Sequence, residues 1–147
     1  AAGSPRPRVG PALEDALDFR RVVEPGAARL AALNPLSGSQ RAWLVEAAAE
    51  VRAAPTDSAH RLADSRLHLA IATASGSPML IESVTRAQAA LGPLLEAIPV
   101  LRTNIAHSHD QHDAVVTAIL TGAADAARAA MEEHCDATSA LVRGFIG

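Results

Sequence analysis

Residues 56–74 read TDSAHRLADSRLHLAIATA, and this stretch decides the fold class. Its apolar side chains recur every three or four residues, which is the period of a helix with one buried face. A spacing of four places Asp64 and His68 one turn apart, on the same face as Leu67 and Ile71. Two ionisable side chains are therefore predicted to point toward the core of a helical protein.

Two later stretches repeat this arrangement with histidine. In residues 104–122, NIAHSHDQHDAVVTAILTG, His112 falls in line with the aliphatic side chains, whereas His107 points away from that face. In residues 123–146, AADAARAAMEEHCDATSALVRGFI, His134 shares its face with alanine, methionine and leucine residues. Both His112 and His134 are therefore predicted to point inward.

Together these inward residues make a complete set of metal ligands: Asp64, His68, His112 and His134. One such histidine alone is better explained as a core residue with a hydrogen-bond partner. Four buried ionisable groups are different, because one divalent cation satisfies them all and removes several desolvation penalties. Three nitrogens and one carboxylate oxygen suit Zn, Ni, Fe or Mn rather than Ca or Mg, and zinc is preferred. Cys135 follows a ligand directly but points about 100° away from it, which favours a core cysteine over a further ligand.

Composition favours one all-α domain. The 147 residues suffice for a single core, aromatic residues make up 2% of them, and no stretch alternates as a half-buried strand would. The net charge is -3 and the basic residues are not clustered, so the sequence predicts no positively charged surface for nucleic acid. This chain is therefore not expected to bind DNA by itself. It has no run of 18 apolar residues and no signal-peptide pattern, which predicts no membrane partner and a cytoplasmic location.

The helical pattern divides into six segments. Residues 1–11 are rich in proline and glycine and are predicted to be a linker or flexible tail, which leaves 12–147 as the folded domain. Helices are expected from Leu13 to about residue 33, after a cap at Ser37 or Ser39, from residue 56, after residue 77, and in the two histidine-bearing stretches. Prolines at 25 and 93 are expected to kink their helices, and Pro99 is expected to be a further break.

The first predicted helix carries a charged pair within its apolar stripe. Arg20 and Glu24 are four residues apart and align with Leu13 and Leu17 rather than with the polar face. One interpretation is a buried salt bridge that holds this helix against its neighbours. The other is that Arg20 lines a cavity and offers its planar guanidinium to a carboxylate ligand.

Three stretches carry a family resemblance. DFRRVVEPGAARLAA (18–32) resembles the first helix of the FCD domain, the effector-binding domain of FadR-type regulators in the GntR family. ADSRLHLAIATASGSPML (63–80) resembles the Asp-x-x-x-His helix of that domain and the small-residue turn after it. QHDAVVTAILTGAADAARAAMEEH (111–134) resembles its closing signature, which ends in Met-x-x-His. The ordered set spans residues 12–143 and is far more specific than any one motif.

The resemblance implies an antiparallel helical bundle around a cavity, with a divalent metal on the cavity floor. In such domains the metal keeps positions open for the oxygens of a small organic acid, and binding rearranges the DNA-binding domains of a dimer. The metal ligands it implies are the four residues named above, and the residues expected to bind the carboxylate effector or line its cavity are Arg20, Glu24, His60 and Arg102. The winged helix-turn-helix domain expected ahead of such a domain is absent from this sequence, so DNA binding would require that missing part.

The chain departs from the family pattern at positions that are not ligands. Leu67 stands where Phe is common, Ser77 where Asn is common, Gln111 where Glu often precedes the third ligand, and Val115 where Ile is usual. Two rival functions stay open. A metal-dependent hydrolase would need a general base, and no unassigned carboxylate falls on the inward faces. A closed structural metal site would be a tetrahedron without room for an effector. A sensor that is not an enzyme is the favoured interpretation.

Overall fold

The computed structural model describes residues 10–99 and 101–146, and within them the chain is almost entirely helical. The predicted all-α class is confirmed, because no strand occurs in these described ranges. Residues 1–9, most of the predicted linker, lie outside the described residues. The six helices are α1 (Pro11–Leu33), α2 (Gly38–Ala53), α3 (Asp57–Ala74), α4 (Pro78–Glu96), α5 (Arg102–Leu120) and α6 (Ala124–Ile146).

Helix starts follow local side-chain chemistry. Ser37 caps α2 in a capping box: its hydroxyl accepts from the backbone N–H of Gln40, and the Gln40 side chain accepts from the backbone N–H of Ser37. Thr56 and Ser77 cap α3 and α4 without the reciprocal bond, each accepting one backbone N–H bond. The sequence had left the α2 cap open between two serines, and the structure selects Ser37.

Prolines mark helix starts more clearly than they mark breaks. Helix α1 begins at Pro11, two residues before the predicted start, because the first helical position needs no N–H donor. Helices α1 and α4 continue past the internal Pro25 and Pro93, so neither residue ends its helix. Pro99 does lie in the connection between α4 and α5, as the sequence predicted.

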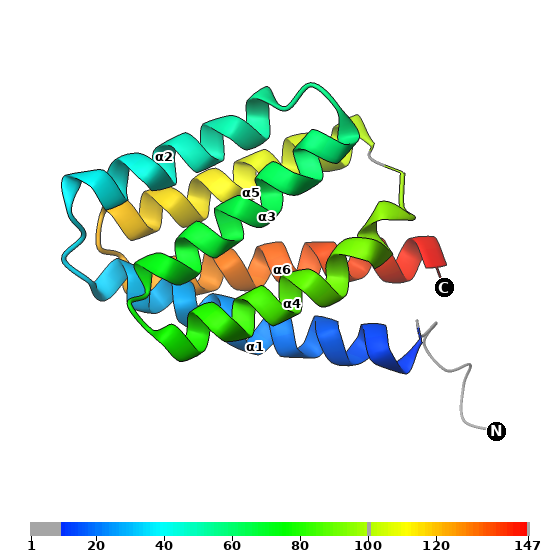
Figure 1. The fold of residues 1–147 in the computed structure, drawn as a ribbon, viewed down its shortest axis with the longest axis horizontal. Coiled ribbons are helices and arrows are strands. Elements are labelled where there is room, and N and C mark those ends of the chain that lie inside the picture. Colours follow the sequence, from blue (N-terminus) through cyan, green and yellow to red (C-terminus); the bar gives the residue numbers. More distant parts are fainter. Residues whose placement is uncertain (1–9, 100, 147) are drawn as a thin grey trace.

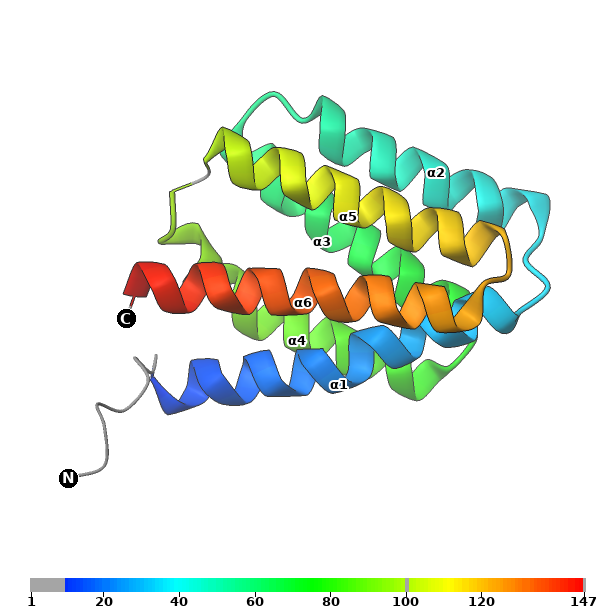
Figure 2. The same ribbon diagram turned by 180° about the vertical axis from the view of Figure 1, so that it is seen from behind.

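Neighbouring helices pack against one another in a closed ring. Helix α1 packs against α4 on one side and α6 on the other, α6 packs on α5, and α2 joins α5 to α3, which returns to α4 (Figures 1 and 2). The start of α1 and the end of α6 lie at the same end of the bundle, so these two helices are antiparallel (Figure 1). None of the helices in the described ranges is both long and apolar enough to cross a bilayer.

Two aliphatic clusters flank the centre of the bundle. The larger one lies where the C-terminal half of α1 meets α2, α3, α5 and α6, and includes Leu44, Leu67 and Met131. The smaller one joins the start of α1 to the ends of α4 and α6, and includes Leu17 and Val142. Along α1 the charged pair of Arg20 and Glu24 falls between these clusters, so the polar centre of the molecule is enclosed on both sides.

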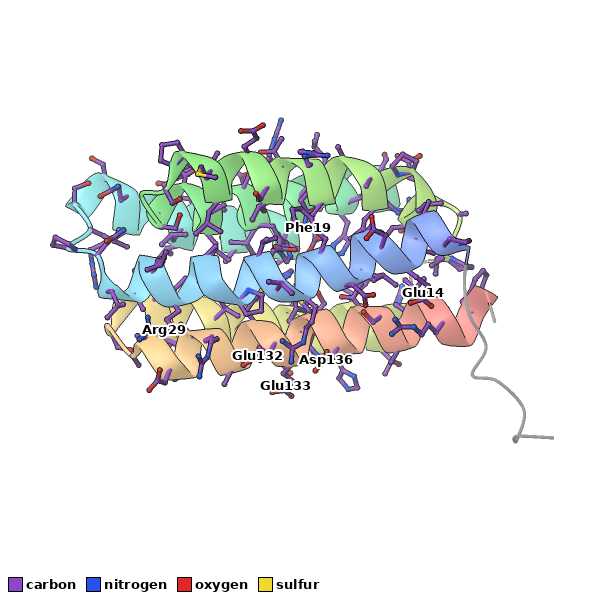
Figure 3. The ribbon with its side chains drawn as sticks, turned by 90° about the horizontal axis from the view of Figure 1, so that it is seen from below. Glu14, Phe19, Arg29, Glu132, Glu133 and Asp136 are labelled. Atoms are coloured by element: carbon purple, nitrogen blue, oxygen red, sulfur yellow. The ribbon has the colours of Figure 1, made fainter. Side chains whose placement is uncertain are left out.

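Ion pairs follow the seam between α1 and α6. Figure 3 looks onto α1 with α4 on one side and α6 on the other, and labels Glu14, Glu132 and Asp136. Arg143 Nη2 lies 2.7 Å from a carboxylate oxygen of Glu14, while Arg21 reaches both Glu132 and Asp136 at 2.8 Å. The Arg21 pairs are exposed and contribute little to the free energy of folding. Glu14, by contrast, is only 8% exposed.

The turn between α3 and α4 is tied to the end of α1. Asn34 Nδ2 donates to the carbonyl oxygens of Ala74 and Ser75, at 2.9 and 2.8 Å. Gly76 follows with φ of +72°, and a Cβ at this position would lie 3.1 Å from Asn34 Nδ2. Glycine is therefore required here both by the backbone conformation and by the close approach of Asn34.

Candidate metal centre

The structure brings the four inward residues together at the centre of the bundle. Asp64, His68, His112 and His134 each offer one ligand atom, and these atoms all lie within 4.8 Å of one another. His112 Nε2 lies 3.1 Å from Asp64 Oδ1 and 3.2 Å from His134 Nε2, and His68 Nε2 lies 3.8 Å from Asp64 Oδ1. Three helices thus converge their side chains on a space of the size that one cation occupies.

Burial distinguishes the histidines from the carboxylate. The three histidines are 4% exposed or less, whereas the Asp64 side chain is 26% exposed because it faces a cavity. The histidines therefore form the enclosed part of the cluster, and Asp64 forms its open edge.

A chain of polar contacts fixes the ring of His68. Its Nδ1 makes a very short hydrogen bond to Oε1 of Glu24, so the opposite nitrogen, Nε2, points to the cluster. Glu24 in turn accepts from Arg20 Nε at 2.5 Å and from Gln88 Nε2 at 3.3 Å. Such a carboxylate behind a histidine orients the ring and makes it a more basic ligand.

A second histidine is held in the same manner by a residue that the sequence analysis did not select. His134 Nδ1 lies 2.6 Å from the amide oxygen of Gln111, which leaves His134 Nε2 directed at the cluster. Gln111 was noted only as a departure from the family pattern. The available signal was its position directly before His112, but only the packing of α5 against α6 shows which ring it meets.

Charge and burial set the protonation of the cluster. Burial would raise the pKa of Asp64, but the charge of His68 and the hydrogen bond from His112 outweigh it and hold that pKa well below its ordinary value. Burial lowers the pKa of His112, and it lowers that of His134 much further with help from the neighbouring histidines. Asp64 is therefore a carboxylate, and these two imidazoles are neutral near pH 7, which are the forms that bind metals.

The next carboxylate away from the cluster shows the same balance. Burial would raise the pKa of Glu24, yet the charges of His68 and Arg20 lower it to about 2. Burial works to lower the pKa of His68, but the carboxylates of Glu24 and Asp64 outweigh it and raise that pKa. The His68 imidazole thus lies between two carboxylates, those of Glu24 and Asp64.

One buried atom tests whether a metal fits this cluster. Among the described residues, two buried side-chain atoms have no hydrogen-bond partner, His68 Nε2 and His112 Nδ1. Only His68 Nε2 faces the cluster, because His112 points its other nitrogen, Nε2, toward Asp64 and His134. A buried polar atom without a partner costs about 1–3 kcal/mol, so it calls for an explanation. A metal ion within reach of Asp64, His112 and His134 would satisfy it, and the donor set is one that suits a divalent transition ion.

A cavity of about 520 Å³ opens beside the cluster. Asp64 and His134 line it, whereas His68 and His112 lie behind them and do not. Arg20 also lines the cavity and is only 4% exposed. The cluster therefore has one accessible side, and a fixed cation stands next to that side.

Comparison with known proteins identifies the family. The profile of the FCD domain matches residues 15–137, which is most of the chain. The chain belongs to the FCD domain family. No curated protein sequence gives a match to the chain. Two solved structures share the fold: Streptococcus agalactiae GntR has 22% identity and a TM-score of 0.75, and E. coli McbR/YncC has 20% identity and a TM-score of 0.81.

The FCD domain is only part of those proteins. The chain covers 57% of the length of the GntR and 69% of McbR/YncC, while 86% and 96% of the chain itself is aligned. Membership of the FCD family points to an effector-binding regulatory domain and away from an enzyme.

The predicted effector-binding residues of this FCD domain fall into two groups. Arg20 and His60 line the cavity, as expected. Glu24 does not line it but lies behind His68 and bonds Arg20, so the charged pair is a buried salt bridge whose arginine also faces the cavity. Arg102 is the first residue of α5, is exposed, and is not among the described residues that line the cavity.

Helical geometry predicts the placement of Cys135 correctly but not that of His107. His107, predicted to point away, lines the cavity, because the cavity extends along α5 toward its start. Cys135 packs within the larger aliphatic cluster, where burial raises the pKa of its thiol to about 12, and it is not part of the ligand group.

Proposed function

We propose that this FCD domain senses a small organic acid through a divalent transition metal bound by Asp64, His68, His112 and His134. The observation that carries the proposal is the unpartnered, buried Nε2 of His68 within a set of four convergent ligand atoms that borders a cavity. A divalent ion bound there, zinc by preference and otherwise nickel, iron or manganese, would supply a Lewis-acidic centre for carboxylate oxygens.

The guanidinium of Arg20 is the protein group that we propose binds the carboxylate of the effector. Arg20 Nε is bonded to Glu24, and no described residue bonds the two terminal Nη nitrogens of Arg20. These nitrogens belong to a side chain that lines the cavity, so they are available to a carboxylate that enters it. Because the Glu24 contact fixes the guanidinium in advance, little side-chain entropy is lost when an acid binds.

Helix α1 is the proposed route from the effector to DNA. It carries Arg20 and packs against α3, α4, α5 and α6, so a ligand that repositions Arg20 acts on the helix nearest the N-terminal end of the domain. In the full-length regulator, a DNA-binding domain would precede α1 and a homodimer would pair two such domains. Effector binding would then change the relative placement of the two DNA-binding domains.

Metal-dependent ligand binding gives a direct test of this function. Citrate, gluconate and hexanoate are added separately to the purified domain, either zinc-loaded or stripped with EDTA, and the melting temperature is measured. At least one acid is expected to raise the melting temperature of the zinc-loaded form, since a ligand at 100 times its Kd stabilises the native state by about 2.7 kcal/mol. Equal shifts in both forms, or no shift with any acid, would refute the proposed mechanism.

The same titration separates a closed structural metal site from the sensor, and the cavity lining bears on the hydrolase. A closed structural site would raise the melting temperature on zinc addition and show no further response to acids. A hydrolase would need a general base beside the metal, and Asp64 is the only carboxylate among the described residues that line the cavity. That carboxylate is already assigned to the metal, so a hydrolase would have to use His60 or His107, which also line the cavity, as its base.

A further inference from the structure

The walls of the cavity change character with distance from the metal centre. Beside the cluster they are polar, with Arg20, Gln88 and Gln111 in addition to Asp64 and His134. Most of the wall surface is nevertheless apolar and is contributed by the second half of α4, the α4–α5 connection, the start of α5 and the second half of α6.

On three helices, the lining changes from polar to apolar side chains at the same distance from the metal centre, as helical periodicity shows. Leu141 lies seven residues beyond His134 on α6, Leu95 lies seven beyond Gln88 on α4, and Ile105 lies seven before His112 on α5. Seven residues correspond to two turns, or about 10 Å along a helix axis. All three of these apolar side chains line the cavity, so a molecule that extends from the cluster meets an aliphatic wall two turns away.

The far end of the cavity is built from structure that is held in place. Ile98 is 5% exposed, lines the cavity and belongs to the smaller aliphatic cluster, as does Leu91 at 1% exposure. Arg61 of α3 reaches across and donates to the carbonyl oxygen of Ile98 at 3.0 Å. This hydrogen bond ties Ile98, just after α4, to α3.

The size and lining of this cavity do not match a small, fully hydrophilic acid. A volume of about 520 Å³ lies within the range of about 300–1,000 Å³ typical of sites that enclose a drug-sized ligand. An apolar wall gains free energy only from apolar ligand surface. Polar side chains such as Asn104, Ser108 and Arg61 also line the cavity, but most of its wall is apolar, so a ligand with an aliphatic part fits it better than a fully hydrophilic acid.

We propose that the effector is an amphipathic monocarboxylate, whose carboxylate lies at the metal and Arg20 while an aliphatic body extends along α4 and α6 toward Leu95 and Leu141. The inference rests on the proposed function and specifies the chemical class that the same site accepts. The single anionic group belongs at the one end of the cavity that combines Asp64, His134 and a buried arginine.

Calorimetric titration of the zinc-loaded domain with butanoate, hexanoate, octanoate, octanamide and citrate tests this class. Affinity is expected to rise with chain length by about fourfold per methylene, as for burial of apolar surface, with octanoate binding more tightly than citrate. Octanamide, which has the same chain without the charge, is expected to bind at least about tenfold more weakly than octanoate. Citrate binding more tightly than octanoate, or no dependence on chain length, would overturn the inference.

Two neighbouring leucines provide matched variants. Leu95 lines the cavity, whereas Leu94 is 38% exposed and is not a lining residue. Leu95→Ala and, independently, Leu141→Ala should each weaken octanoate binding by about tenfold and leave butanoate binding unchanged. Leu94→Ala should leave both affinities unchanged, and loss of octanoate affinity in that variant alone would also contradict the proposal.

The outcomes of these titrations distinguish failure of the amphipathic ligand class from failure of the proposed sensor function. Metal-dependent binding of citrate in preference to octanoate would retain the sensor and reject the amphipathic class. Equal binding of octanoate before and after EDTA treatment would support the apolar wall and reject the metal-borne carboxylate. Absence of binding by every acid would reject both.

Discussion

At the scale of single residues, the centre depends on side chains that do not touch the proposed metal. Glu24 and Gln111 each bond the outer nitrogen of a ligand histidine and thereby direct the inner nitrogen to the cluster. Their sequence signals were unequal. Glu24 was conspicuous because a carboxylate within an apolar stripe needs a partner, whereas Gln111 lies beside a stripe, where a polar residue needs no explanation.

Glu24→Gln is predicted to lower zinc affinity by about 10- to 100-fold, because the amide loses the charge that makes His68 basic. Competition with a chromogenic chelator measures the affinity of the folded variant, and Glu82→Gln, an exposed change on α4, is the matched control. Glu24→Gln also leaves Arg20 less well paired, so the metal-free variant should be less stable. Reduced stability with unchanged zinc affinity would show that Glu24 has a structural role only.

At the scale of helices and turns, much of the molecule could be predicted from its periodicity and caps. The six segments, the three inward histidines and the role of residue 99 between α4 and α5 all follow from spacing and from proline chemistry. The first helix was predicted two residues short, because a proline reads as linker although it is well tolerated at the first helical position. Internal prolines are predicted to kink their helices, and both helices continue past them, so neither proline ends its helix.

The turn between α3 and α4 provides a stability test at this scale. Gly76→Ala is predicted to destabilise the domain by about 1–2 kcal/mol, because an L-residue at φ of +72° is strained and its Cβ would press on Asn34. Gly26→Ala is the matched control within α1, where a Cβ meets nothing within 4 Å, and it should stabilise by about 0.5–1 kcal/mol. Urea unfolding measures both, and the account of the turn fails if the two variants shift stability in the same direction.

At the scale of the whole molecule, the bundle encloses a polar centre between two aliphatic clusters. The sequence predicted that the four ligand residues face inward, since that depends only on helical period. It could not predict which ligands border the cavity or how far the cavity extends, because those features depend on how α4 stands apart from α5 and α6. The placement of Arg102 outside the cavity has the same origin: its direction depends on where α5 begins.

The central claim is that these four side chains bind one metal ion together. Elemental analysis of the purified, chelator-free domain tests it most directly, with His134→Ala as the variant and His107→Ala as a matched control outside the ligand group. The account predicts about one transition-metal ion per chain in the wild-type and His107→Ala proteins, and loss of that ion together with a lower melting temperature in His134→Ala. A folded wild-type domain that contains no metal, and whose melting temperature does not respond to added zinc, would contradict it.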